Sequence, residues 1–240
     1  MRGILKKDLS DNLWPELVFG AIFLLGFGLS LVFMAYIGVP YDPSTKDDNT
    51  FLNGMTSLAS SIGLAMSVSY ASSLTIGMMM RDMKSGWIQF LVTIGITRKE
   101  IYWAKTGYGL LASGAMALLV FPMFFGISYY QVNAMGYDLG YINMVSWLNL
   151  FFVCAGMSAL GNLAGFAFSP NISSLLVSIG VFLGLALSFG GGLTIFLPPD
   201  TSSSYGLALV WVEVIVFLLS VTATVLLNWA FYRSFTRKDM

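Results

Sequence analysis

Six long apolar segments set the limits on what this chain can fold into. A helix needs about 20 consecutive apolar residues to cross the hydrocarbon core of a bilayer. By that criterion we predict six spans, at residues 16–38, 54–79, 105–130, 144–168, 173–197 and 206–232. Long continuous runs favour helices over the short alternating strands of an outer-membrane barrel. The expected fold is therefore an all-α membrane protein, with residues 1–240 forming a single transmembrane domain.

The composition agrees with an exterior that faces lipid. Of the 240 residues, 57% are hydrophobic and only 10% are charged, whereas soluble domains carry roughly 25% charged residues. The formal net charge is zero, so it points to no charged partner, and we expect no nucleic-acid binding. The lipid bilayer is the surrounding that this composition requires.

The distribution of basic residues predicts the orientation. All but one of the 12 lysines and arginines flank the predicted spans on the same side, and only Lys46 lies on the other. Cytoplasmic segments carry this excess. We therefore expect a multi-pass protein of the bacterial plasma (inner) membrane, with both termini and the 81–104 loop in the cytoplasm.

Residues 1–13 mix apolar side chains with Lys6, Lys7 and Asp8. This mixture is typical of a short amphipathic helix on the cytoplasmic leaflet, where lysines meet anionic headgroups. A frayed polar terminus is the alternative.

The 81–104 loop carries a helical pattern. Trp87, Phe90, Leu91 and Ile94 fall at positions i, i+3, i+4 and i+7, which predicts a short helix with its apolar residues on one face. The expected product is a protruding apolar ridge rimmed by charge, suited to docking against a partner. An interfacial helix with snorkelling cations is the alternative that needs no partner.

A second helix is expected directly after Gly95. Thr97 and Glu100 have the T-x-x-E spacing of a capping box, in which each side chain satisfies a free backbone N–H at a helix start. The capped helix then continues into the third span.

Small residues recur at every fourth position in several spans, which is typical of close packing between membrane helices. Gly161 and Gly165 do so in the fourth span, and Gly180, Gly184, Ser188 and Gly192 in the fifth. The second span has a longer set: Ser57, Ser61, Ala65, Ser69, Ser73 and Gly77. Helix contact is one interpretation, and a hydrophilic path past Ser61 and Ser69 is the other.

Glu213 lies inside the sixth span. An ionisable group at membrane depth is costly and is a candidate for function. The sequence leaves open whether it lines a translocation path or stays near the outer interface.

The chain lacks the residues that most catalytic and metal sites require. It has no histidine and a single cysteine, Cys154, which excludes the usual zinc sites and the His-dependent nucleophiles. No G-x-x-x-x-G-K-[ST] motif is present to cradle nucleotide phosphates. We expect no enzyme activity, cofactor or metal in this chain.

The loop and the N-terminus together resemble the permease subunits of type-2 (export-class) ATP-binding-cassette transporters. The N-terminal segment of that family, an apolar residue followed by Lys-Asp-Leu, matches Leu5 to Leu9. The loop pattern of the family is matched in order by Asp82, Ser85, Gly86, Trp87, Phe90, Thr97, Arg98, Lys99 and Lys105. One departure is Gly95, where the family usually has a proline in the turn.

The resemblance implies a mechanism. The loop helix would be a coupling helix that docks on a separate ATPase subunit, with Asp82, Ser85, Gly86, Trp87, Phe90, Leu91, Arg98 and Lys99 at the contact. The N-terminal helix, with Lys6, Lys7 and Asp8, would brace it. Two permease chains, as a homodimer or heterodimer, would pair with two ATPases, which bind the ATP and Mg²⁺.

The expected function is therefore that of an export permease. Because the predicted spans hold few charges, a hydrophobic or amphipathic substrate is expected, and a peptide toxin or antimicrobial peptide is the first guess. A stand-alone channel or secondary transporter is the alternative. It would have to rely on Glu213 and would leave the apolar loop helix without a role.

Overall fold

The computed structural model describes residues 2–37, 67–135, 140–168, 172, 176, 179–180 and 203–237. Within these residues all the regular structure is helical. The helices are α1 (Arg2–Ile37), a helix over residues 67–84, α3 (Trp87–Thr93), α4 (Arg98–Met135), α5 (Gly140–Ala167) and α7 (Ser203–Arg237).

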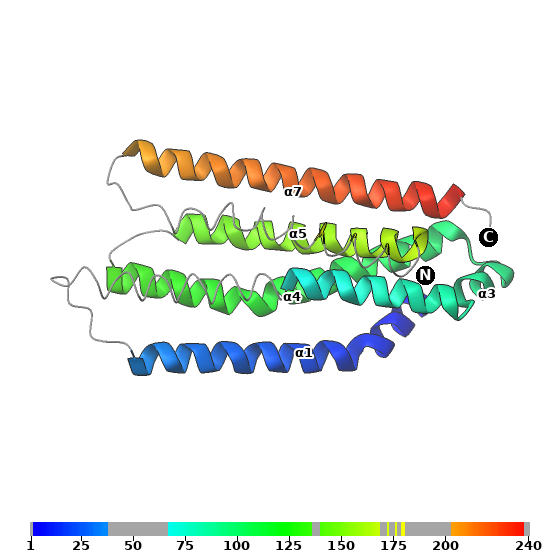
Figure 1. Cartoon of the computed structure of the whole chain (residues 1–240), viewed down its shortest axis with the longest axis horizontal. Coiled ribbons are helices and arrows are strands. Elements are labelled where there is room, and N and C mark those ends of the chain that lie inside the picture. Colours follow the sequence, from blue (N-terminus) through cyan, green and yellow to red (C-terminus); the bar gives the residue numbers. More distant parts are fainter. Residues whose placement is uncertain are drawn as a thin grey trace.

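The long helices lie side by side in one elongated bundle (Figure 1). Helix α4 packs against α1 on one side and α5 on the other, and α5 packs against α7. The first turns of α1, the short helix α3 and the last turns of α7 lie at the same end of the bundle. We call this the α3 end.

Three helices are long and apolar enough to cross a membrane by length and composition. They are Arg98–Phe121 in α4, Trp147–Ala167 in α5 and Val214–Arg237 in α7, among the described residues. They confirm that the chain has the character of an all-helical membrane protein. They fall within or overlap the predicted third, fourth and sixth spans, so six spans remain a prediction. Most of the predicted fifth span lies outside the described residues.

Helix α1 combines the predicted N-terminal helix and the first predicted span. It runs without interruption from Arg2 to Ile37 and contains Pro15. Proline removes a backbone hydrogen bond and crowds the preceding turn, so it kinks a helix. In Figure 1 the N-terminal turns of α1 are bent away from the rest of the helix and lie against the α3 end.

Glycines bring α5 into close contact with the helix over residues 67–84. A methyl group on Gly161 would lie 2.2 Å from Oγ1 of Thr75, and one on Gly165 would lie 3.0 Å from Cβ of Met79. This confirms helix contact as the role of these two glycines. Gly180 also packs against α5, because a methyl group there would meet the Leu160 side chain at 2.3 Å.

The small residues of the predicted second span only partly lie at a helix contact. Ser57, Ser61 and Ala65 lie outside the described residues. Ser69 is half-buried, whereas Ser73 and Gly77 are exposed. The buried face of this helix is instead formed by Val68, Ala71, Ser72, Thr75, Met78 and Met79, so helix contact within the bundle is wrong for Ser73 and Gly77.

Candidate functional site: an ion network beneath the surface helix α3

Helix α3 is held between two glycine turns. Gly86 precedes it with φ 69°, and Gly95 follows it with φ 88°, both in the left-handed region that favours glycine. The N–H of Ile96 donates to the carbonyl of Leu91, and the N–H of Gly95 donates to that of Val92. These bonds form a Schellman motif, which ends the helix at Thr93.

The predicted capping box at the start of α4 is confirmed. The N–H of Thr97 donates to the Glu100 carboxylate at 3.0 Å, and the N–H of Glu100 donates to the Thr97 hydroxyl at 3.3 Å. Because Arg98 is the first residue of α4, α3 and α4 are joined by a short turn of fixed geometry.

The predicted apolar ridge on α3 is only partly correct. Phe90 is 51% exposed, but Leu91 is 2% exposed and packs into the bundle with Ile88. Trp87 is half-buried and stacks on Phe90, with ring centroids 5.5 Å apart. Ile94 is exposed and lies beyond the last turn of the helix. The prediction of Leu91 in a protruding ridge was wrong, because α3 needs a buried face to sit on the bundle.

Beneath α3 lies an apolar cluster to which every described long helix contributes. It includes three phenylalanines from α5 and α7, with the Phe166 and Phe235 rings 5.0 Å apart. Its members are Ile4, Met79, Ile88, Leu91, Ile101, Tyr102, Ala104, Phe166, Phe231 and Phe235. The α3 end is thus a packed core rather than a loose loop.

Beside this cluster, Lys105 of α4 is fully buried between two carboxylates from different elements. Its Nζ donates to both oxygens of Asp8 in α1, each at 2.8 Å, and to Asp82 at the end of the 67–84 helix. Asp8, Asp82 and Lys105 are all exposed by 1% or less. Burying charges is tolerated only where they are paired and hydrogen-bonded, and here the cation is shared by two acids.

Lys7 extends this network to the surface. Its Nζ lies 3.1 Å from Asp82 and 3.4 Å from Asp11, and it sits over the Trp87 ring at 4.9 Å from the centroid. Arg81 pairs with Asp11 at 3.4 Å. We call the set Lys7, Asp8, Asp11, Arg81, Asp82 and Lys105 the ion network.

Burial dominates the electrostatics of Asp8. Loss of hydration raises the pKa of its carboxyl above the ordinary value of 3.8, although Lys105 opposes the change. Its backbone carbonyl also accepts a hydrogen bond from the Asn12 side chain at 2.7 Å. Ile4, Asp8 and Asn12 are buried on one side of α1, so the first turns of α1 are docked on the bundle.

The three predicted site residues of the N-terminal helix, Lys6, Lys7 and Asp8, differ in their burial. Lys6 is exposed, as expected of a residue facing headgroups. Lys7 is half-buried in the ion network, and Asp8 is fully buried. Sequence spacing gave no sign that Asp8 would face Lys105, because the two residues are 97 positions apart.

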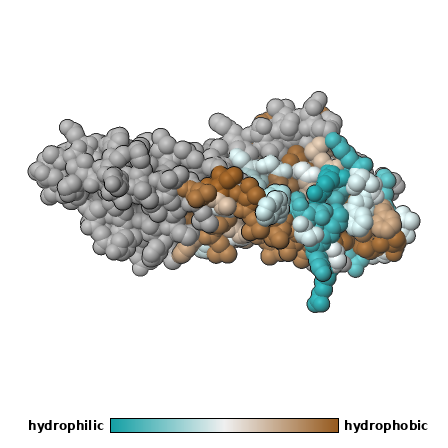
Figure 2. Space-filling model, turned by 90° about the horizontal axis from the view of Figure 1, so that it is seen from below, coloured by the Kyte–Doolittle hydropathy of each residue, from teal (hydrophilic) through white to brown (hydrophobic). Residues whose placement is uncertain are grey.

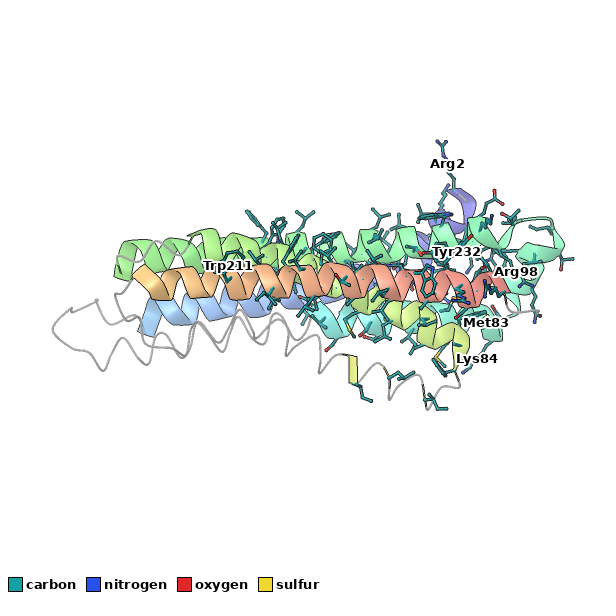
Figure 3. All side chains as sticks on the ribbon, turned by 90° about the horizontal axis from the view of Figure 1, so that it is seen from above. Arg2, Met83, Lys84, Arg98, Trp211 and Tyr232 are labelled. Carbon is teal, nitrogen blue, oxygen red and sulfur yellow. The ribbon has the colours of Figure 1, made fainter. Side chains whose placement is uncertain are left out.

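The remaining predicted site residues of the loop lie near α3 and do not take part in the ion network. Ser85 is exposed and its hydroxyl donates to the Asp82 carbonyl at 3.3 Å. Arg98 is half-buried and Lys99 is exposed in the first turn of α4. Arg2, Lys84 and Arg98 lie at the α3 end, with Arg2 directed away from the bundle, whereas Trp211 lies toward the opposite end of α7 (Figure 3).

Of the three candidates for a translocation path, Ser69 alone has a side chain among the described residues, so this path stays a prediction. Ser69 is half-buried on the 67–84 helix. Ser61 and the Glu213 side chain lie outside the described residues.

One polar contact was missed from the sequence. The Tyr108 hydroxyl of α4 donates to the Glu16 carboxylate of α1. Glu16 lies two turns after Asp8 on the face of α1 that packs on α4, and that spacing was the available signal.

Viewed from below, the hydrophilic side chains of the described residues gather toward the α3 end, and hydrophobic side chains cover much of the adjoining surface (Figure 2). The polar end and the apolar flank are what a helical bundle needs if it crosses a bilayer and presents one end to water.

Compared with protein-family models, with curated proteins and with solved structures, the chain matches none of them.

Proposed function

We propose that this chain is the permease subunit of an ATP-driven exporter, powered by a separate ATPase subunit that docks on α3. The observation that carries the proposal is the meeting of the two motif segments. Asp8 from the N-terminal motif and Asp82 and Lys105 from the loop motif form one buried ion network. The resemblance relates these residues only through their order in the sequence, and in the structure they are in direct contact beneath α3.

The surface of α3 supports docking. Phe90 of α3 is 51% exposed and Ile94, directly after the helix, is 55% exposed, whereas Ile88 and Leu91 fix α3 to the bundle. Lys84 and Lys99 are exposed, and Lys84 and Arg98 lie at the α3 end of the bundle (Figure 3). An aromatic anchor with a charged rim on a rigid base is typical of a binding hot spot, and a partner with an acidic rim around an apolar groove would complement it.

The proposal includes two permease chains, as a homodimer or heterodimer, in a bacterial plasma membrane with both termini cytoplasmic. ATP and Mg²⁺ would be bound by the ATPase, and this chain would bind neither. An amphipathic peptide, such as a toxin or antimicrobial peptide, is the proposed substrate class.

Affinity purification in mild detergent tests the proposal. The tagged chain is expected to retain a soluble protein whose sequence, identified by mass spectrometry, contains a nucleotide-binding G-x-x-x-x-G-K-[ST] motif, together with ATPase activity. Phe90→Ala should reduce its recovery by about tenfold, the loss expected of one hot-spot aromatic.

Gln89→Ala is the matched control, because Gln89 is exposed on the same helix but is polar. It should leave recovery unchanged. A chain that purifies without any such ATPase, or equal loss in both variants, would reject α3 as the docking site.

A further inference from the structure

A continuous series of contacts joins the exposed surface of α3 to the buried cation of α4. Phe90 stacks on Trp87, and Trp87 lies under the Lys7 ammonium at 4.9 Å. Lys7 pairs with Asp82, and Asp82 shares Lys105 with Asp8.

Lys105 is the centre of this series, since it is bound by residues of two other elements. Asp8 belongs to the N-terminal turns of α1, and Asp82 lies in the last turn of the 67–84 helix, which leads into α3. Removing its charge would leave two carboxylates buried at 0% and 1% exposure with Lys7 alone nearby. Such an unbalanced state is strongly unfavourable.

Apolar packing also contributes to holding these elements on the bundle. Ile4, Ile88 and Leu91 share one buried cluster, but apolar contacts are non-directional. Paired charges fix one arrangement, because each donor must meet its own acceptor. The ion network therefore sets the position of the N-terminal turns relative to α3, which the apolar cluster by itself does not.

We infer that Lys105 is a positioning residue. Its ion pairs hold the N-terminal turns of α1 and residues 82–97, which include α3, in a fixed position relative to each other, so that the two segments move together as one unit. A displacement of Phe90 is then transmitted to α1 through Trp87, Lys7 and Asp82. The unit is a property of the chain alone. Its use in moving the spans during transport rests on the proposed function.

Hydrogen exchange measured by mass spectrometry on the full-length chain in detergent tests this inference without any partner. In Lys105→Met, amide exchange in residues 5–14 and in residues 83–95 should both accelerate, by roughly tenfold or more. Amides in residues 150–160 and 220–230 should be unchanged, which shows that the bundle is folded. Lys99→Met is the matched control, since Lys99 is an exposed lysine of the same helix.

The charge exchange Asp8→Lys with Lys105→Asp is expected to restore protection in both segments, because it keeps a cation between two carboxylates. Lys105→Gln provides a milder variant should Lys105→Met fail to fold, because it keeps a hydrogen-bond donor between the two carboxylates, and it should loosen the same two segments to a smaller extent.

Three results would overturn the inference: acceleration confined to one of the two segments, no acceleration in either, or loosening that the charge exchange does not reverse. Since no ATPase is present, these results bear on the unit alone. A confirmed unit in a chain that retains no ATPase would reject the proposed function and leave the inference standing.

Discussion

At the residue scale, the unusual feature of this chain is a fully buried lysine, Lys105, with acidic partners from two other helical segments. A buried ion pair is weak evidence for stability, because desolvation can exceed the attraction between the charges. Burial is also the largest cause of the raised pKa of Asp8, with Lys105 opposing it. We therefore interpret the ion network as a device for position.

The pH dependence of the docked N-terminal turns follows from Asp8. A carboxyl whose pKa is raised on docking binds its proton more tightly when docked, so its contribution is fully present below its ordinary pKa of 3.8 and is lost as pH rises through the raised value. Lys105 and Lys7 oppose the rise in the pKa of the Asp8 carboxyl, whereas the nearby negative charge of Asp82 adds to it.

We predict that protection of residues 5–14 against hydrogen exchange, corrected for the intrinsic exchange rate, does not fall on acidification from neutral pH and rises toward pH 4. In Asp8→Asn this rise should be absent. A loss of protection on acidification that Asp8→Asn abolishes would contradict the sign of the pKa change.

At the element scale, glycine placement decides how closely α5 approaches the 67–84 helix. A methyl group on Gly161 would lie 2.7 Å from the Ser72 carbonyl oxygen as well as close to Thr75. Because one of these atoms is backbone, a side-chain rotation cannot relieve the contact.

Gly161→Ala is predicted to lower the free energy of unfolding by about 1–3 kcal/mol, the usual cost of overpacking. Titration with a denaturing detergent measures it. Gly77→Ala is the control, because nothing lies within 4 Å of the added methyl group, and it should be neutral or stabilising by up to about 1 kcal/mol through helix propensity. Equal destabilisation by both changes would show that the Gly161 contact is not specific.

Sequence patterns predicted those helix features that depend on residues close together in the chain. The capping box at Thr97 was readable because it depends on residues three positions apart. The Gly161 and Gly165 contact was readable because both residues lie on one face of α5. The longer set in the second span failed at Ser73 and Gly77, since a step of four residues turns about 40° past one helical turn, so six such positions wind around the helix.

The burial of α3 and the ion network could not be predicted in detail. An apolar residue on a seven-residue surface helix can face the bundle or a partner, and the spacing of Phe90 and Leu91 does not decide between them. Pairing of Lys105 with Asp8 and Asp82 depends on how three elements pack. The resemblance grouped these residues, and tertiary structure determined their contacts.

At the scale of the whole molecule, the hydrophilic side chains that Figure 2 shows among the described residues gather toward the α3 end, which also holds the first and last turns of the described chain (Figures 1 and 2). This arrangement fits the predicted orientation, in which the basic flanks of the spans face the cytoplasm.

Cysteine labelling of intact cells tests that orientation. Cysteines placed at Lys84 and Ser234 should react only after the membrane is permeabilised, whereas one placed at Ser44, which lies outside the described residues, should react from outside. Cys154 is buried and provides the unlabelled background. Labelling of all three positions from the same side would overturn the topology.

Site-specific photo-cross-linking in cells tests whether an ATPase docks on α3. A photoreactive amino acid replaces Phe90, and in a matched protein it replaces Trp211, which is 64% exposed toward the other end of α7. We predict that position 90, and not position 211, becomes joined to a soluble protein carrying a nucleotide-binding G-x-x-x-x-G-K-[ST] motif. No protein adduct at position 90, or the same adduct at both positions, would contradict docking of an ATPase on α3.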